Sequence, residues 1–173
     1  MMKKALSIFL IFFLFTLPAA ASDWQNSEKA QIQSEFTAFN ERAKTKDLNM
    51  IQDALPPAFM KYLADKDGQD VETLKASMTK AMEMSFANIK TIEGSFNPDD
   101  ILYRQSSDGA KYAIIPYKTH IVLTSGQEVT ADSKVAAIMV EGKYWFLDVG
   151  KEINVMVIKT VYPEYKDLDV SVN

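Results

Sequence analysis

Residues 111–149 read KYAIIPYKTHIVLTSGQEVTADSKVAAIMVEGKYWFLDV, and this stretch decides the fold. Apolar and polar residues alternate along it, with two interruptions, at Ser125-Gly126-Gln127 and at Glu141-Gly142. Alternation with a period of two is typical of strands with one buried face, and short interruptions that contain glycine are typical of tight turns. The stretch therefore predicts three antiparallel strands, over Lys111–Thr124, Glu128–Val140 and Lys143–Val149.

The register of the first hairpin follows from the charge pattern of its two strands. A two-residue loop, Ser125-Gly126, would place Asp132 and Lys134 on the same face as the apolar side chains of the first strand. A three-residue loop, Ser125 to Gln127, instead brings the apolar side chains of both strands onto one face. We therefore expect the three-residue loop, which places His120 opposite Asp132 on the other face, with Lys118 and Lys134 nearby.

The Glu141-Gly142 turn carries both faces on into the third strand. Tyr144, Phe146 and Asp148 then join the core face, opposite Met139, Ala137 and Val135. Trp145 and Leu147 join the outer face, beside Ile138 and Ala136. A sheet with helices on one face is usually polar on the other, so we expect another segment or another molecule to cover this apolar patch. Two covers are open: a second copy of the chain on Ile138, Trp145 and Leu147, or the tail after Pro163 with Tyr165 and Leu168.

Upstream of these strands the hydrophobic period is that of helices. Ile32, Phe36, Phe39 and Ala43 form one stripe of a helix over residues 27–46, with Ser27 as its cap. Three further helices are expected: a short one from Asp47 to Leu55, a short one that Pro57 opens, and a long one from Asp70 to near Asn88. Three further strands are expected, over Thr91–Phe96, Ile101–Gln105 and Ile153–Tyr162. A loose tail is expected from about residue 163. Helices first and an antiparallel meander second predict an α+β domain, with N-terminal helices packed on a curved sheet of four to six strands.

The first 21 residues have the pattern of a secretory signal peptide. Lys3 and Lys4 precede an apolar stretch that ends at Leu17, and Ala19-Ala20-Ala21 supplies the small residues of a cleavage site before Ser22. We expect the leader to be cleaved, leaving a single domain over residues 22–173. That domain would be periplasmic or secreted, with no stable membrane anchor after cleavage.

The composition excludes several classes of function. The 173-residue chain has a net charge of -4, one histidine and no cysteine. An acidic domain has no electrostatic footprint for nucleic acid, and the absence of cysteine excludes disulfides, a thiol nucleophile and Cys-bound zinc. Met78 and Met82 could offer thioethers to copper, but they share a helix stripe with Leu74 and Ile89, which favours core packing. We expect no metal site and no cofactor.

These features resemble the nuclear transport factor 2-like superfamily with its cystatin-like cone fold. The resemblance covers about residues 28–162 and includes the first helix ending in Lys46-Asp47-Leu48, the short helices that follow and the bent sheet. Residues 141–149, EGKYWFLDV, are similar to the superfamily's frequent penultimate strand, in which a glycine turn precedes a tryptophan. The resemblance implies a pocket between sheet and helices and often a sheet-to-sheet dimer. It implies no single function, because members include enzymes, adaptors and binding domains.

The expected pocket offers two candidate sets of catalytic residues. Its lining would be Phe36, Tyr117, Tyr144, Phe146 and Asp148. Asp148 would be a carboxylate at the edge of an apolar cavity with Tyr117 and Tyr144, as a general base requires, or else only an acceptor of backbone hydrogen bonds at a strand end. His120 with Asp132 is a weaker candidate, either as an acid–base pair or as an exposed cross-strand contact.

The sequence favours binding over catalysis, because it shows no convergent set of polar residues around its single histidine. We expect a non-catalytic binding or accessory domain of the envelope, of a secretion system or of an immunity type, with an envelope protein as candidate partner. The alternative is a small lyase, isomerase or hydrolase that uses Asp148 with Tyr117 or Tyr144. A deep cavity around these residues would favour the enzyme, and a filled cone would exclude it.

Overall fold

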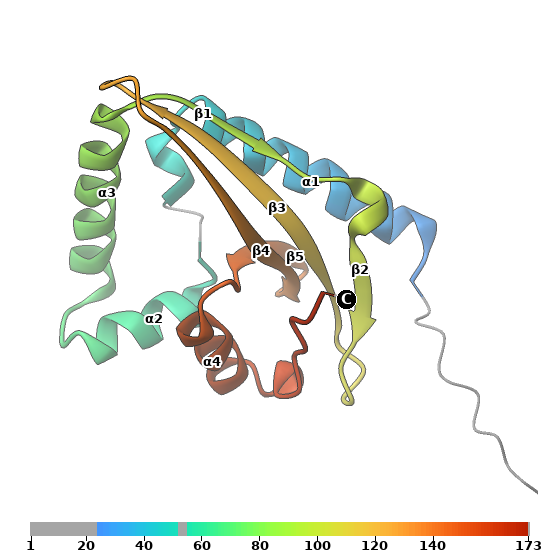
Figure 1. Cartoon of the computed structure of the whole chain (residues 1–173). Helices are drawn as coiled ribbons and strands as arrows, with labels where there is room; N and C mark the ends of the chain where they lie inside the picture. Colours follow the sequence, from blue (N-terminus) through green and yellow to red (C-terminus); the bar gives the residue numbers. More distant parts are fainter. Residues whose placement is uncertain (1–23, 52–54, 173) are drawn as a thin grey trace, which may run out of the picture.

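A computed structural model describes residues 24–51 and 55–172 (Figure 1). Its N-terminal part consists of α1 (Asn26–Lys44), the 3-10 turn η1 (Leu48–Ile51), α2 (Pro57–Lys66) and α3 (Val71–Ala87). The sheet follows as β1 (Ile89–Ser95), the 3-10 turn η2 (Pro98–Asp100), β2 (Leu102–Gln105), β3 (Lys111–Leu123), β4 (Glu128–Val140) and β5 (Lys143–Asp148), and the chain ends with α4 (Glu152–Val161) and η3 (Pro163–Tyr165). The α+β class, with helices against a curved antiparallel sheet, is confirmed.

The N-terminal helices begin where the sequence supplies start signals. The Asp70 carboxylate accepts a hydrogen bond from the Thr73 backbone N–H at 2.7 Å, which caps α3 as expected. Pro57 stands in the first turn of α2, where its missing N–H costs nothing. At α1 the Glu28 carboxylate accepts from the Gln25 N–H at 2.8 Å, so this helix starts before the expected cap, Ser27.

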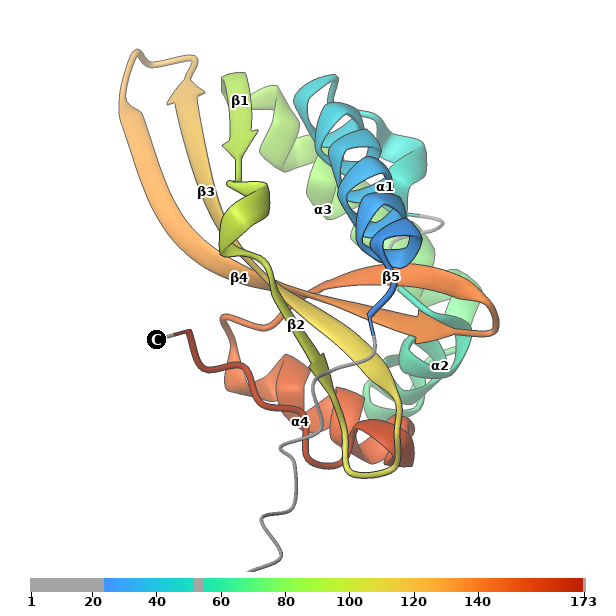
Figure 2. The same cartoon turned by 90° about the vertical axis from the view of Figure 1, so that its right-hand side faces the viewer.

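The sheet has the strand order β1-β3-β4-β5, and β2 pairs with β3 on the same edge as β1. β3 and β4 are long strands of 13 residues each, and both bend strongly along their length (Figure 2). The concave face packs on α1, with Ile32 and Phe36 against Ile115 and Ala137. This arrangement forms the expected cone.

The pairing of β4 with β5 is the one expected, with Tyr144 opposite Met139 and Trp145 opposite Ile138. The β3–β4 hairpin has the expected faces but is shifted by two residues, so that His120 lies opposite Thr130. The cause is the turn. The Leu123 N–H donates to the Gln127 carbonyl at 2.8 Å, which makes the loop Thr124 to Gly126, and Gly126 takes a φ of 87°. A shift of two leaves every side chain on its own face.

Residues 152–161 form a helix, so the expected strand over Ile153–Tyr162 is wrong. The segment is rich in β-branched residues, which is why its pattern suggested a strand. Its Val157 and Ile158 are buried on one side against the sheet, and this tertiary burial outweighs the local preference. The Asn154 side chain donates to the Asp148 carbonyl at 2.7 Å and holds the start of α4 at the end of β5.

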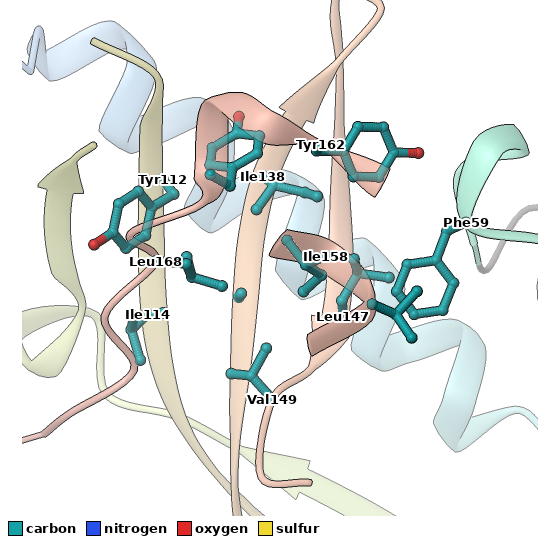
Figure 3. Packing of buried hydrophobic residues seen from close by; sticks show 12 residues of the cluster. Phe59, Tyr112, Ile114, Ile138, Leu147, Val149, Ile158, Tyr162 and Leu168 are labelled. Atoms are coloured by element: carbon teal, nitrogen blue, oxygen red, sulfur yellow. The ribbon is translucent and has the colours of Figure 1, made fainter. Parts of the chain in front are cut away.

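α4 and the C-terminal tail cover the convex face of the sheet (Figure 3). Ile138 and Leu147 are buried there in one cluster with Ile158 and Leu168. The tail after Pro163 is therefore not loose, because Tyr165 and Leu168 are only 1% and 3% exposed. Of the two expected covers, the chain uses its own tail, together with α4. A second copy could reach Ile138 and Leu147 only after α4 and the tail had left.

The expected signal peptide, residues 1–21, and its cleavage site before Ser22 lie outside the described residues. Within the described parts of the chain, no helix has the length and apolar character needed to cross a membrane.

Candidate functional site

Aromatic rings fill the space between α1 and the concave face of the sheet. Phe36 is fully buried, and its ring centroid lies 5.0, 5.2, 5.4 and 6.0 Å from those of Phe96, Phe146, Tyr117 and Phe39. Tilted and edge-to-face contacts of this kind stabilise a core beyond the area that they bury. A hollow of about 220 Å³ remains between α1 and β5 at the margin of this cluster. The expected pocket residues Phe36, Tyr117, Tyr144 and Phe146 do lie close together, but their rings occupy the cone.

The hydroxyl of Tyr117 is engaged with α1 and β1. It donates to the Asn40 Oδ1 at 2.6 Å, and the Asn40 Nδ2 donates to the Gly94 carbonyl at 2.8 Å. A Cβ on residue 94 would overlap both the Tyr117 hydroxyl and the Asn40 oxygen, so this approach requires glycine. Burial raises the pKa of Tyr117 and keeps its hydroxyl protonated as a donor. These contacts give Tyr117 a bracing role between three elements.

Asp148 does not enter the cone. Its side chain is exposed at the end of β5, and its Oδ1 accepts from the Gly150 N–H at 2.9 Å. This is the common role of an aspartate where a strand turns. Tyr144 is buried, and burial, with a smaller contribution from Glu28, raises its pKa. The expected set of Asp148 with Tyr117 or Tyr144 therefore lacks a buried carboxylate.

His120 and Asp132 are not partners, because the hairpin is shifted by two residues. The His120 Nδ1 lies 3.1 Å from the Thr130 Oγ1, and its Nε2 lies 3.7 Å from a Glu128 carboxylate oxygen. Asp132 lies 3.6 Å from the Lys118 Nζ instead. These are cross-strand contacts at the surface, so the expected acid–base pair is not formed.

Open space lies on the surface along the C-terminal tail. One hollow of about 750 Å³ is lined by the β1–β2 connection, the middle of β3 and β4, and Val172. A second of about 660 Å³ is lined by α4, Val149 and the tail around Val170. Lys134 and Gly150 line both hollows, so the two adjoin. We call the two hollows together the tail groove.

The tail groove combines an apolar lining with charged groups of both signs, because Glu152 lines its second hollow and Asp100 and Asp132 line its first. Its second hollow contains Val149, Val155, Met156 and Val170 beside Lys134, Lys159 and Lys166. The Lys134 Nζ donates to the Val170 carbonyl at 3.1 Å, and the Lys166 Nζ pairs with the Asp108 carboxylate at 2.8 Å. The Lys159 Nζ makes no side-chain hydrogen bond or close ion pair within the described residues, and its charge helps to lower the pKa of the nearby Asp169 carboxyl.

The three methionines of α3 differ in burial, and Met82 is half-buried. Met78 packs beside the cluster of Met60, Ala64 and Leu74, and Met84 is exposed. Within the described residues, no group of three His, Asp or Glu side chains is placed to hold a metal ion.

The tail groove was not foreseen from the sequence, for a specific reason. The walls of its second hollow come mainly from α4 and from the tail, the two segments whose structure was expected to be a strand and a loose end. The one available signal was the surplus of apolar residues on the outer face of the sheet, which required a cover.

Comparisons with known proteins find similarity at the level of fold. Aln2 from a Streptomyces species is 9% identical, with 77% of this chain and 97% of that chain covered and a TM-score of 0.48. An NTF2-like protein of unknown function from Burkholderia pseudomallei is 12% identical, with 78% of this chain and 97% of that chain covered and a TM-score of 0.39. No family model and no curated protein matches the chain. The similarities concern the fold, and no activity follows from them.

Proposed function

We propose that this protein is an exported, non-catalytic binding domain whose ligand site is the tail groove. The supporting observation is where the space lies. The cone, in which the family resemblance implies a pocket, is filled by Phe36 and its aromatic neighbours, whereas two adjoining hollows follow the tail. Tyr117 lines the hollow of about 750 Å³, and Tyr144 lines the hollow of about 220 Å³. The Tyr117 hydroxyl is bonded to Asn40 and Asp148 is exposed at the end of β5, so the geometry does not assemble the Asp/Tyr set that the lyase, isomerase or hydrolase alternative needs. The exported location rests on the leader pattern of residues 1–21.

The lining of the groove favours an elongated ligand that is apolar along its length and anionic at one end. Val155, Met156 and Val170 provide the apolar wall. Lys159 provides a positive charge beside that wall, where a low-dielectric surface strengthens its attraction for an anion. A fatty acid has this chemistry and serves as the probe.

Titration calorimetry of residues 22–173 with dodecanoate tests the proposal. We expect binding that Lys159→Glu weakens at least tenfold, which corresponds to about 1.4 kcal/mol. The matched control is Lys80→Glu, the same change of charge on the exposed surface of α3, away from the groove. Dodecanol, which lacks the anionic group, should bind more weakly than dodecanoate. Failure of dodecanoate to bind, or equal affinity for Lys159→Glu and Lys80→Glu, would show that the tail groove is not this site.

A further inference from the structure

Half of β4 has an edge without a neighbouring strand. β4 pairs with β3 from Glu128 to Ile138, but β5 reaches only Val135–Val140. The Val149 N–H donates to the Lys134 carbonyl at 2.8 Å, and the chain then leaves the sheet to form α4. Within the described part of the chain, residues 128–133 therefore pair with β3 alone. Figure 2 shows this part of β4 as the outermost strand of the sheet.

The backbone groups on this edge belong to alternate residues. The Gln127 carbonyl accepts from Leu123 and so faces β3, whereas the Lys134 carbonyl faces the β5 side. Because consecutive residues of a strand point their backbone groups to opposite sides, Glu128, Thr130 and Asp132 present theirs outward. Each of the three offers one N–H and one C=O to a further strand.

Of the usual devices that prevent strand addition, this edge has only charged side chains, those of Glu128 and Asp132. Natural edges are commonly shortened, bulged, or blocked by proline or lysine. Here the pairing with β3 continues without a register shift, and residues 128–133 include no proline and no lysine. β1 supports β3 from the other side over Lys118–Leu123. The edge is thus a regular, preformed template.

We propose that this edge binds an extended segment of a partner protein as an added antiparallel strand, in line with β5. The alternation of side chains defines the chemistry of that segment. On one face of the edge Val129 and Ala131 are exposed. On the other face the carboxylate side chains of Glu128 and Asp132 are 66% and 81% exposed. The complementary segment therefore alternates apolar residues with basic ones.

A second copy of the same hairpin fits this edge poorly. Paired antiparallel along residues 128–133, the copy would carry its own turn, residues 124–126, past Lys134. That position is already occupied by Val149, which pairs with Lys134. A linear segment has no turn and can end at Ser133, so the edge favours a peptide over self-association.

Two peptides of seven residues test the proposal, one alternating lysine with valine and the other glutamate with valine. With the isotopically labelled domain, residues 22–173, the basic peptide should shift the amide resonances of Glu128, Thr130 and Asp132, and the acidic peptide should not. Thr130→Pro removes an outward N–H and should weaken binding at least tenfold. Thr130→Val is the matched control, because it loses the same contact with His120 but keeps the N–H.

A pair of charge changes provides a test that does not depend on proline. Glu128→Lys with Asp132→Lys should reverse the preference, so that the acidic peptide binds and the basic one does not. Equal affinity of Thr130→Pro and Thr130→Val, an unchanged preference in the double variant, or shifts confined to the tail groove would each overturn the proposed edge site. So would pairing of two unliganded copies through residues 128–133. Asp132 also lines the first hollow of the tail groove, but Glu128 and Thr130 line neither hollow, so the comparison of Thr130→Pro with Thr130→Val separates failure here from failure of dodecanoate binding.

Discussion

Gly94 shows how a single residue can determine the interior of the cone. At this position β1 comes close to α1 and β3, and the Asn40 amide bridges the Gly94 carbonyl and the Tyr117 hydroxyl. The space that a Cβ would need is already occupied by these two side chains. The three elements can therefore make this contact only because Gly94 has no side chain.

Gly94→Ala is expected to lower the free energy of unfolding by about 2–3 kcal/mol, measured by urea denaturation. The reason is that the new Cβ displaces the Tyr117 hydroxyl and leaves the Asn40 amide unpaired. Gly150→Ala is the control, because the nearest atom to its Cβ is a flexible Asp148 oxygen at 3.1 Å. A loss in Gly94→Ala no larger than in this control would contradict the bracing role of the contact.

Among the elements, the C-terminal tail supplies hydrogen bonds that the sheet lacks at the end of the β3–β4 ladder. The Tyr165 hydroxyl accepts from the Met139 N–H at 3.0 Å, and it lies 3.3 Å from the Lys111 carbonyl. These groups lie just beyond Tyr112 and Ile138, the last pair of the β3–β4 ladder. The tail thus closes the end of the ladder with a side chain.

Because the Tyr165 hydroxyl is buried here, the free energy of unfolding falls at alkaline pH. Burial raises the pKa of Tyr165 to about 12, above its ordinary value of 10.0, because the buried hydroxyl disfavours the charged form. Its contribution is fully present below pH 10 and is lost as the pH rises from 10 to 12, by about 3 kcal/mol.

Urea denaturation between pH 8 and pH 11 measures the first part of this loss. Tyr165→Phe should be less stable than wild type at pH 8, because the Met139 N–H loses its acceptor. Above pH 10 the free energy of unfolding of this variant should decline less steeply than that of the wild type. Tyr117, Tyr144 and Tyr162, whose pKa values burial also raises, remain in both proteins and act as the internal reference. Parallel decline of the two proteins would show that Tyr165 does not carry the effect.

On the scale of the whole molecule, the sheet separates two hydrophobic clusters. α1 covers the concave cluster, and α4 with the tail covers the convex one, which also includes Phe59 of α2. The convex surface, for which a second copy was one of the two covers left open, is thus part of the core of one chain.

Light scattering of residues 22–173 tests this consequence. We expect Trp145→Glu to leave the mass unchanged, because Ile138 and Leu147 beside it are already covered. Leu168→Asp is the complementary variant, and it should raise the mass or unfold the chain by uncovering that face. A wild-type dimer that Trp145→Glu divides into monomers would instead restore the expected interface.

Local signals in the sequence were sufficient for most elements and for the faces of the sheet. Asp70 and Pro57 marked helix starts, and the strand Glu128–Val140 was predicted with the bounds that it has. Alternation placed Tyr144 and Phe146 on the core face and Trp145 and Leu147 on the other. These features depend on residues that are close in the chain. The hydrophobic period of a segment and the capping residue of a helix are therefore enough to predict them.

Only the tertiary structure decided the hairpin register, the helix α4, the position of Asp148 and the tail groove. A shift by two residues preserves every face, so alternation cannot distinguish Thr130 from Asp132 as the partner of His120. The β-branched residues of 152–161 suit either a strand or a helix, and burial of Val157 and Ile158 against the convex face selects the helix. Contacts between residues far apart in the chain settle such choices, because the free energy of burial exceeds the small differences in local preference.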